Sequence, residues 1–227
     1  MSHHHHHDNS SGQAVLVAFL SNLGFAIVEI IFGTIFNSSA IVADAVHDTG
    51  DALAIGLSYY FERFSRKETD SNYTLGYLRF SLLGAMLTSV ILIVGSLFVI
   101  VENVGKVLNP QPVDYNGMLI LGIVAIVVNL LASRVLNGDR SEQEDILSLH
   151  FLEDTLGWFA VIVVSIVLRF TDWYILDPLL SLAISIFILY KALPKFMRNL
   201  QVFLEKRPAS LDLHGLKAKL LEIEGLK

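Results

Sequence analysis

Long apolar stretches separated by short polar segments dominate the pattern of this chain. Each stretch approaches or exceeds the roughly 20 residues that an α-helix needs to cross about 30 Å of hydrocarbon. The stretches lie at about 13–36, 39–61, 81–101, 116–136, 146–170 and 173–193. The pattern therefore predicts an all-α, polytopic membrane protein with six transmembrane helices.

The polar segments predict where these helices end. Asn37 and Ser38 leave room only for a tight hairpin between the first two helices, and the Asn-Pro-Gln-Pro run at 109–112 predicts a rigid turn after the third. Trp173 and Tyr174 are typical of the aromatic belt at a membrane surface. We expect Pro194 to break the sixth helix.

The two ends of the chain differ from its apolar middle. Residues 1–12 contain five consecutive histidines and predict a disordered tail, either a purification tag or a metal-collecting segment, before a membrane domain at 13–193. Residues 194–208 are expected to form a linker. Residues 209–227 read as an amphipathic helix, and a single helix cannot bury its apolar face alone. We therefore expect this helix to begin a soluble cytoplasmic domain that lies mostly outside this chain.

Composition narrows the chemistry of any metal site. Of the 227 residues, 53% are hydrophobic and 17% are charged, which is unusual for a soluble domain. The net charge of −6 says little about partners, because charge in such a protein is confined to loops and a few buried sites. Cysteine is absent, so disulfides and thiolate ligands are excluded and a metal site must use histidine and carboxylates.

Basic residues indicate the orientation in the membrane. They gather after the second, fourth and sixth predicted helices, and the opposite side offers only Lys106 and Arg169. The basic residues near the ends of the second, fourth and sixth helices are Arg63, Arg66, Lys67, Arg79, Arg134, Arg140, Lys191, Lys195, Arg198, Lys206 and Arg207. The positive-inside rule then predicts a multi-pass membrane protein with both termini in the cytoplasm.

Two His-x-x-x-Asp pairs inside apolar stretches are the candidate metal ligands. His47 and Asp51 lie in the second predicted helix, and His150 and Asp154 repeat the spacing in the fifth. Residues four apart stand on one helix face, so each pair can grip an ion from one side. Two imidazoles and two carboxylates suit a tetrahedral zinc-like ion better than calcium or magnesium, whose sites are built mainly from oxygen.

Other acidic residues in the apolar stretches are candidates for supporting roles. Glu29 should face a bundle interior or water, because an ionisable group in hydrocarbon is costly, and it is a candidate for a supporting or proton-relay role. Asp44 lies two turns before Asp51 and is a candidate entrance or supporting carboxylate. Asp48 is rotated about 100° from His47, which favours a contact with a neighbouring helix. Asp177 is interpreted as a cap for the sixth helix, with an orienting or relay role near the site as the alternative.

The arrangement resembles the cation diffusion facilitator family of zinc transporters, in particular its bacterial zinc and cadmium efflux members. The resemblance rests on SAIVADAVHDTGD in the second helix, LDPLLSLAISIFILY in the sixth and the repeated His-x-x-x-Asp pairs, and it covers the chain from about Gln13 to its end. It implies an α/β cytoplasmic domain, a homodimer, and export of Zn²⁺ in exchange for protons. It also implies that His47, Asp51, His150 and Asp154 hold the transported ion.

The resemblance also points to the loop after the second helix, where some family members bind a second zinc ion through histidines. Tyr73 and Tyr77 occupy those places here, so Glu68 and Asp70 can form only a weak site.

Two other function classes compete with a transporter. An intramembrane metalloenzyme is disfavoured because the His-Glu-x-x-His and Gly-x-Ser-x-Gly motifs are absent, and because four protein ligands leave no open coordination position. A passive channel is disfavoured because channels use weak, multiple sites rather than a closed cage. We therefore expect a carrier and no enzymatic activity, with cadmium, cobalt and nickel left open as alternatives to zinc.

Overall fold

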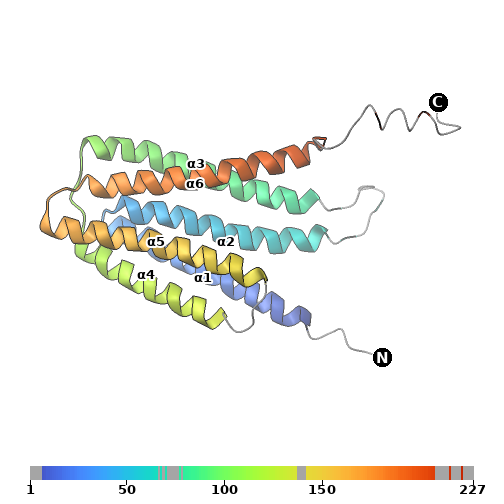
Figure 1. Ribbon diagram of the computed structural model, residues 1–227, viewed down its shortest axis with the longest axis horizontal. Coiled ribbons are helices and arrows are strands. Elements are labelled where there is room, and N and C mark those ends of the chain that lie inside the picture. The colour runs from blue at the N-terminus through green and yellow to red at the C-terminus, as the bar shows by residue number, and fades with distance from the viewer. Residues whose placement is uncertain are drawn as a thin grey trace.

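The computed structural model describes residues 7–65, 67, 70, 77, 79–136, 142–207, 215 and 221, with side chains for all of these except 7–18, 21, 62–63, 132–136 and 142–153. Regular secondary structure in this part of the chain is entirely α-helical (Figure 1). The helices are α1 (His7–Ile35), α2 (Ser39–Ser65), α3 (Arg79–Leu108), α4 (Tyr115–Leu136), α5 (Glu142–Phe170) and α6 (Leu176–Phe203). The expected all-α class is confirmed for the described residues.

The helix boundaries differ from the sequence-based expectation at the two ends of the bundle. Helix α1 begins at His7, earlier than the expected start near Gln13. The expectation that Pro194 breaks the last helix is wrong, because α6 runs through Pro194 to Phe203. A proline removes one backbone N–H donor and can leave the rest of the helix intact.

Helix α6 ends instead in a left-handed turn. Glu205 has φ of 57°, and the Lys206 N–H donates to the carbonyl of Gln201 over 2.8 Å. The part of the expected linker from 194 to 203 is therefore helical, and the expected cytoplasmic domain falls almost entirely outside the described residues.

The turn between α1 and α2 is as tight as expected. Asn37 takes up a left-handed conformation with φ of 54°, and the Ser38 N–H donates to the Gly33 carbonyl over 2.8 Å. This is the Schellman ending of a helix, in which asparagine can replace the usual glycine. Helix α2 therefore starts one residue after the turn and runs back along α1.

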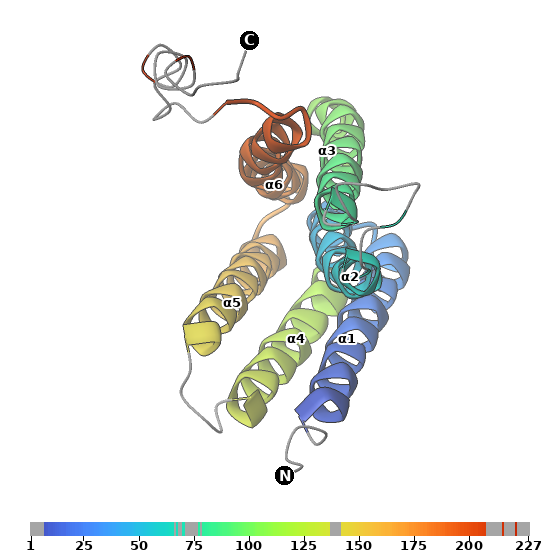
Figure 2. The ribbon, with the colours of Figure 1, turned by 90° about the vertical axis from the view of Figure 1, so that its right-hand side faces the viewer.

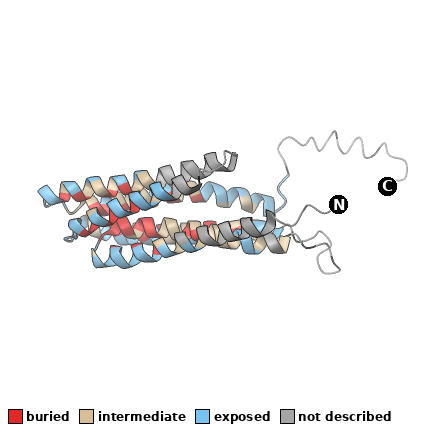
Figure 3. Ribbon diagram, turned by 90° about the horizontal axis from the view of Figure 1, so that it is seen from below, coloured by how far each residue is buried: buried red, intermediate tan, exposed pale blue. Residues whose placement is uncertain are grey.

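The helices run lengthwise, and the start of α1 and the end of α6 lie at the same end of the molecule (Figure 1). Helix α2 packs against α1 on one side and against α3 and α6 on the other, while α4 pairs with α5 (Figure 2). We call the opposite end, formed by the connections at 36–38, 109–114 and 171–175, the hairpin end. Buried residues are concentrated toward this hairpin end (Figure 3).

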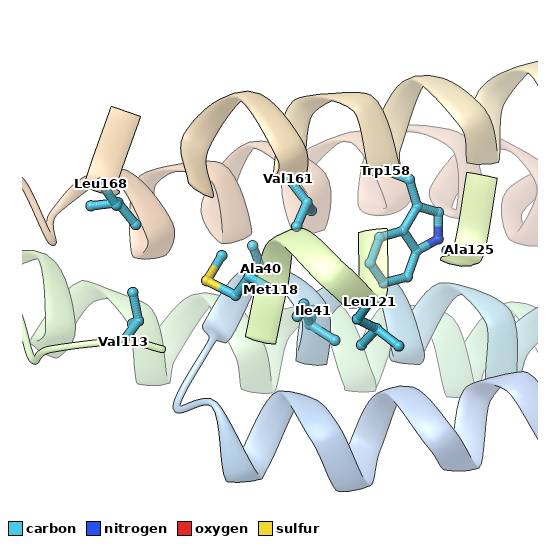
Figure 4. Packing of buried hydrophobic residues seen from close by; sticks show 9 residues of the cluster. All are labelled: Ala40, Ile41, Val113, Met118, Leu121, Ala125, Trp158, Val161 and Leu168. Carbon is cyan, nitrogen blue, oxygen red and sulfur yellow. The ribbon is translucent and has the colours of Figure 1, made fainter. Parts of the chain in front are cut away.

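The apolar core joins α2, α4 and α5. Trp158 and Val161 of α5 face Met118 and Leu121 of α4, and Ile41 of α2 lies beside Leu121 in the same cluster (Figure 4). The ring of Phe25 from α1 meets Trp158 edge to face, with the ring centroids 6.0 Å apart. This cluster fixes α2 against α5, which carry the two predicted ligand pairs.

Two helices, α3 and α6, are long and apolar enough to cross a membrane on length and composition, among the residues the structure describes. Only 28% and 33% of their most apolar windows is buried inside the chain. Large side chains such as Phe98, Val101, Phe187 and Tyr190 are exposed on these helices. Apolar surface of this kind is what a lipid environment would cover.

Candidate metal centre

One imidazole lies between two carboxylates from different helices. Nε2 of His47 is 3.6 Å from Oδ2 of Asp51, one turn further along α2, and 3.9 Å from Oδ1 of Asp154 on α5. The structure thus brings together three of the four predicted ligands. The fourth, His150, lies on α5 one turn before Asp154, but its side chain is outside the described residues.

The separations can be compared with those around a metal ion. Two ligand atoms that each lie about 2.0–2.1 Å from a tetrahedral zinc ion are about 3.4 Å apart. The observed 3.6 and 3.9 Å exceed this value by a few tenths of an ångström. Among the described side chains, no group of three or more His, Cys, Asp or Glu residues is arranged so that it could hold a metal ion. The two distances from His47 would reach metal-binding separation if Asp51 and Asp154 each moved a few tenths of an ångström closer to the imidazole.

Small residues on α2 let its neighbours come close to these ligands. Gly50 is buried, and a Cβ atom built on it would lie 2.6 Å from Cγ of Leu92 on α3. On α5, a Cβ atom added to Gly157 would be 3.7 Å from Oδ1 of Asp44. Helix α2 also carries three fully buried alanines, Ala43, Ala45 and Ala52. The ligands therefore sit on a helix that is narrow enough to be packed on both sides.

Exposure rises along α2 from the hairpin end. Ser39 and Asp44 are buried, whereas the side chains of His47 and Asp51 are 20% and 24% exposed, and that of Asp154 is 13% exposed. The first turn of α2 is thus buried, while the predicted ligands further along the helix are partly exposed.

Further carboxyl groups lie near these ligands. Glu29 on α1 is fully buried, and no donor among the described residues reaches either of its carboxylate oxygens. Its carboxyl group lies close to the Asp48 carboxyl group of α2. Asp48 therefore faces α1, away from the face that carries the predicted ligands.

Asp177 occupies a different place from the one expected. It stands in the first turn of α6, where the N-cap is Ile175 with no side-chain cap bond, so the interpretation as a cap for α6 is wrong. Its carboxylate instead caps α2: it accepts hydrogen bonds from the Ser38 hydroxyl at 2.6 Å and from the backbone N–H groups of Ser39 at 2.7 Å and Ala40 at 3.3 Å. Sequence spacing holds no signal for this contact, because Ser38 and Asp177 are 139 residues apart.

The loop after α2 is described only in part. Oδ2 of Asp70 accepts a hydrogen bond from the Tyr77 hydroxyl over 2.6 Å, while Glu68 lies outside the described residues. One oxygen of Asp70 is thus already bonded to one of the tyrosines that stand where some family members have histidine. The weak loop site stays an expectation from the sequence.

Comparison with known proteins identifies the class to which this helical bundle belongs. The model of the "Cation efflux transmembrane domain" matches residues 15–204, which is most of the chain. The chain therefore belongs to the cation efflux family of membrane transport proteins, and the resemblance seen in its motifs is confirmed.

Individual relatives agree with this assignment. The chain is 29% identical over 219 residues to the "Cadmium, cobalt and zinc/H(+)-K(+) antiporter" of Bacillus subtilis, covering 95% of this chain and 70% of that protein. It is 31% identical over 211 residues to "Zinc transporter ZitB" of Pectobacterium atrosepticum, covering 91% and 66%. It is 26% identical to "Metal cation efflux system protein CzcD" of Cupriavidus metallidurans, covering 89% and 65%. The chain thus spans about two thirds of the length of these relatives.

Proposed function

We propose that this chain forms the membrane part of a carrier that exports zinc, and related divalent ions such as cadmium or cobalt, from the cytoplasm in exchange for protons. The observation that carries the proposal is the position of His47 between Asp51 of α2 and Asp154 of α5. His150, one turn before Asp154, completes the ligand set. An imidazole among carboxylates favours a borderline ion over calcium or magnesium.

Protons and the metal compete for the same side chains in this proposal. Histidine and carboxylate ligands must be deprotonated to hold a metal, so binding of zinc releases protons and uptake of protons releases zinc. An inward-moving proton contributes about 2.3 kcal/mol per 100 mV of membrane potential, which can drive export of the metal. The name of the Bacillus subtilis relative, an antiporter for metals against H⁺ and K⁺, supports exchange of this kind.

The increase in exposure along α2 supports alternating access. We assign the six helices as membrane spans with both ends of the chain in the cytoplasm, as the basic residues indicate. The buried first turn of α2 then lies toward the outer side of the membrane, and the partly exposed His47 and Asp51 lie nearer the cytoplasm. Export requires the opposite state, in which the outer side opens and protons replace the metal.

Glu29 and Asp44 are assigned supporting roles in proton transfer or ligand orientation, because both are buried acids in helices that line the site. The homodimer and the location in the inner membrane remain proposals that rest on the family resemblance.

The decisive experiment is zinc uptake into proteoliposomes under an imposed proton gradient. An acidic interior should drive zinc inward through molecules whose cytoplasmic face points outward, and an indicator inside the vesicles reports the flux. The variants Asp51→Ala and Asp154→Ala should each lose at least about tenfold in rate, because each removes one of four ligands. The matched control is Asp172→Asn, which changes an exposed carboxylate in the α5–α6 connection.

Two results would refute the proposal. Zinc flux that ignores the pH difference would exclude proton exchange, and full flux in both alanine variants would exclude His47, Asp51 and Asp154 as the transport site.

A further inference from the structure

The start of α2 is held by residues from two other helices. The Asp177 carboxylate of α6 accepts three hydrogen bonds from Ser38, Ser39 and Ala40, at 2.6, 2.7 and 3.3 Å. Nζ of Lys106 in α3 also donates to the Ser39 hydroxyl oxygen over 2.9 Å. We call these five residues the α2 anchor.

The α2 anchor is placed where a carboxylate stabilises a helix most. The first backbone N–H groups of a helix have no partner within the helix, and they form the positive end of the helix dipole. Asp177 satisfies two of these N–H groups with a negative charge, and the Lys106 ammonium lies close enough to attract that charge. Ser38, Ser39 and Asp177 are all buried, so water cannot readily replace the bonds.

Further bonds hold the same end of the molecule. The Asn37 side-chain amide donates to the Pro112 carbonyl over 2.9 Å, and the Asp114 N–H donates to the Phe36 carbonyl over 2.9 Å. The α1–α2 hairpin is thus tied to the α3–α4 connection as well as to α6. The start of α2 is a fixed point from which the rest of the helix extends toward its ligands.

The distance from this fixed point to the ligands sets the required accuracy. His47 lies eight residues after Ser39, which is about 12 Å along the helix axis. A tilt of about 5° at Ser39 would then move His47 by about 1 Å. The two oxygens nearest to His47 Nε2 are within a few tenths of an ångström of the separation that a tetrahedral ion needs. An error of 1 Å would therefore weaken the grip of the site on its metal.

We propose that Asp177 is a positioning residue, which anchors the start of α2 so that His47 and Asp51 meet Asp154 at metal-binding separation. This inference rests on the proposed function, since it assumes that these three side chains hold the transported ion. It assigns Asp177 no contact with the metal and no part in proton transfer, because both of its oxygens are already bonded to α2.

The test is the zinc dependence of transport by Asp177→Asn in the full chain. The amide nitrogen of asparagine cannot accept a hydrogen bond, so the bond from Ser39 or those from Ser38 and Ala40 are lost together with the charge. We expect KM for zinc to rise about tenfold, as for other residues that orient metal ligands, while the maximal rate stays within about twofold. A purely structural role would lower the amount of active protein, and hence the maximal rate, without changing KM.

A double substitution tests whether Asp177 acts through α2. Zinc binding is measured by calorimetry on Asp177→Asn, Asp51→Ala and the combined variant. If Asp177 acts by placing the α2 ligands, Asp177→Asn should raise the dissociation constant by a smaller factor in the Asp51→Ala background than in the parent chain, because one of the two ligands that it places is already gone. Fully additive effects would overturn the inference. If Asp177→Asn does not fold, Ser38→Ala takes its place, with an expected rise in KM of about threefold. It removes the bond from the Ser38 hydroxyl to Asp177 and the bond that this hydroxyl accepts from the Ile41 N–H.

The outcomes separate the inference from the proposed function. Normal zinc binding by Asp51→Ala would mean that the proposed transport site is wrong, whatever Asp177 does. Weak binding by Asp51→Ala together with an unchanged KM in Asp177→Asn would leave the transport site standing and overturn the positioning role. Asp172→Asn, five residues earlier and exposed, is the control that should change neither quantity.

Discussion

His47 is the residue on which the proposed chemistry converges. Its Nε2 atom is within 4 Å of carboxylate oxygens from two helices, so one imidazole links α2 to α5. Asp51 is the neighbour that spacing predicts, because it lies one turn away on the same face. Asp154 is a neighbour only through the packing of α2 against α5. The site therefore depends on a contact between elements as well as on a motif.

Glu29 gives a prediction about stability. It is fully buried, and no donor in the described part of the chain reaches its carboxylate oxygens. Glu29→Gln keeps the shape and supplies an amide that can donate to Asp48, so the free energy of unfolding should rise by about 1–3 kcal/mol. For a chain of this size, that corresponds to about 2–4 °C per kcal/mol in the melting temperature measured in detergent at pH 8.

The control for Glu29 is Glu102→Gln. Glu102 is exposed and paired with Lys106 at 2.7 Å, so its replacement should change the free energy of unfolding by no more than about 1 kcal/mol. An unchanged or lower melting temperature for Glu29→Gln would show that the buried carboxyl group is already satisfied.

Residues differ in how far the sequence alone could place them. His47, Asp51, His150 and Asp154 were predicted as ligands because their spacing puts each pair on one helix face, and three of the four side chains are described and lie together. The partner of Asp177 could not be predicted, since a carboxylate at the start of one helix is expected to cap that helix. Here it caps a helix 139 residues away, and only the tertiary packing brings the two together.

At the scale of elements, α2 is the helix that the others surround. It packs against α1, α3 and α6, and its start contributes Ala40 and Ile41 to the core shared with α4 and α5. The apolar stretches predicted each helix because a long apolar run has few alternatives to a helix. The ends were harder to predict, since Pro194 was expected to break α6 and does not.

Gly50 tests how closely α2 must approach α3. A Cβ atom at this position would lie 2.6 Å from Cγ of Leu92, so Gly50→Ala should push the two helices apart and lower the free energy of unfolding by about 1–3 kcal/mol. Because Gly50 lies between His47 and Asp51, zinc affinity should fall as well. Thermal unfolding in detergent and calorimetry with zinc measure the two effects.

Gly24→Ala is the matched comparison. Gly24 lies inside α1, and a Cβ atom there would meet nothing within 4 Å. Alanine should therefore stabilise the helix by about 0.5–1 kcal/mol through its higher helix propensity. If both variants were stabilised, the contact between Gly50 and Leu92 would not limit the approach of α2 to α3.

At the scale of the whole molecule, the start of α1 and the end of α6 lie at one end, and the tight connections lie at the other (Figure 1). Basic residues collect at the first of these ends, which is why we place it in the cytoplasm. The absence of cysteine makes this assignment directly testable, because any introduced thiol is the only one in the protein.

The prediction concerns labelling of two single-cysteine variants in intact cells. Gln111→Cys, in the exposed connection after α3, should react with a membrane-impermeant maleimide added outside. Lys206→Cys, exposed just after α6, should react only once the membrane is permeabilised. The parent chain should remain unlabelled in both conditions. Labelling in the reverse order would invert the proposed direction of transport.

The α2 anchor also has a consequence for biosynthesis. Its carboxylate is encoded 139 residues after Ser38, so four further helices are synthesised, wholly or in part, before the first turn of α2 can acquire its cap. Until α6 emerges from the ribosome, the amides of Ser39 and Ala40 lack this acceptor, and the start of the second helix is held only by its bonds to α3 and to the α3–α4 connection. On the positioning role proposed for Asp177, His47 and Asp51 therefore reach their final position only when the last helix has docked, and a nascent chain that stalls after α5 should bind zinc less tightly than the finished protein.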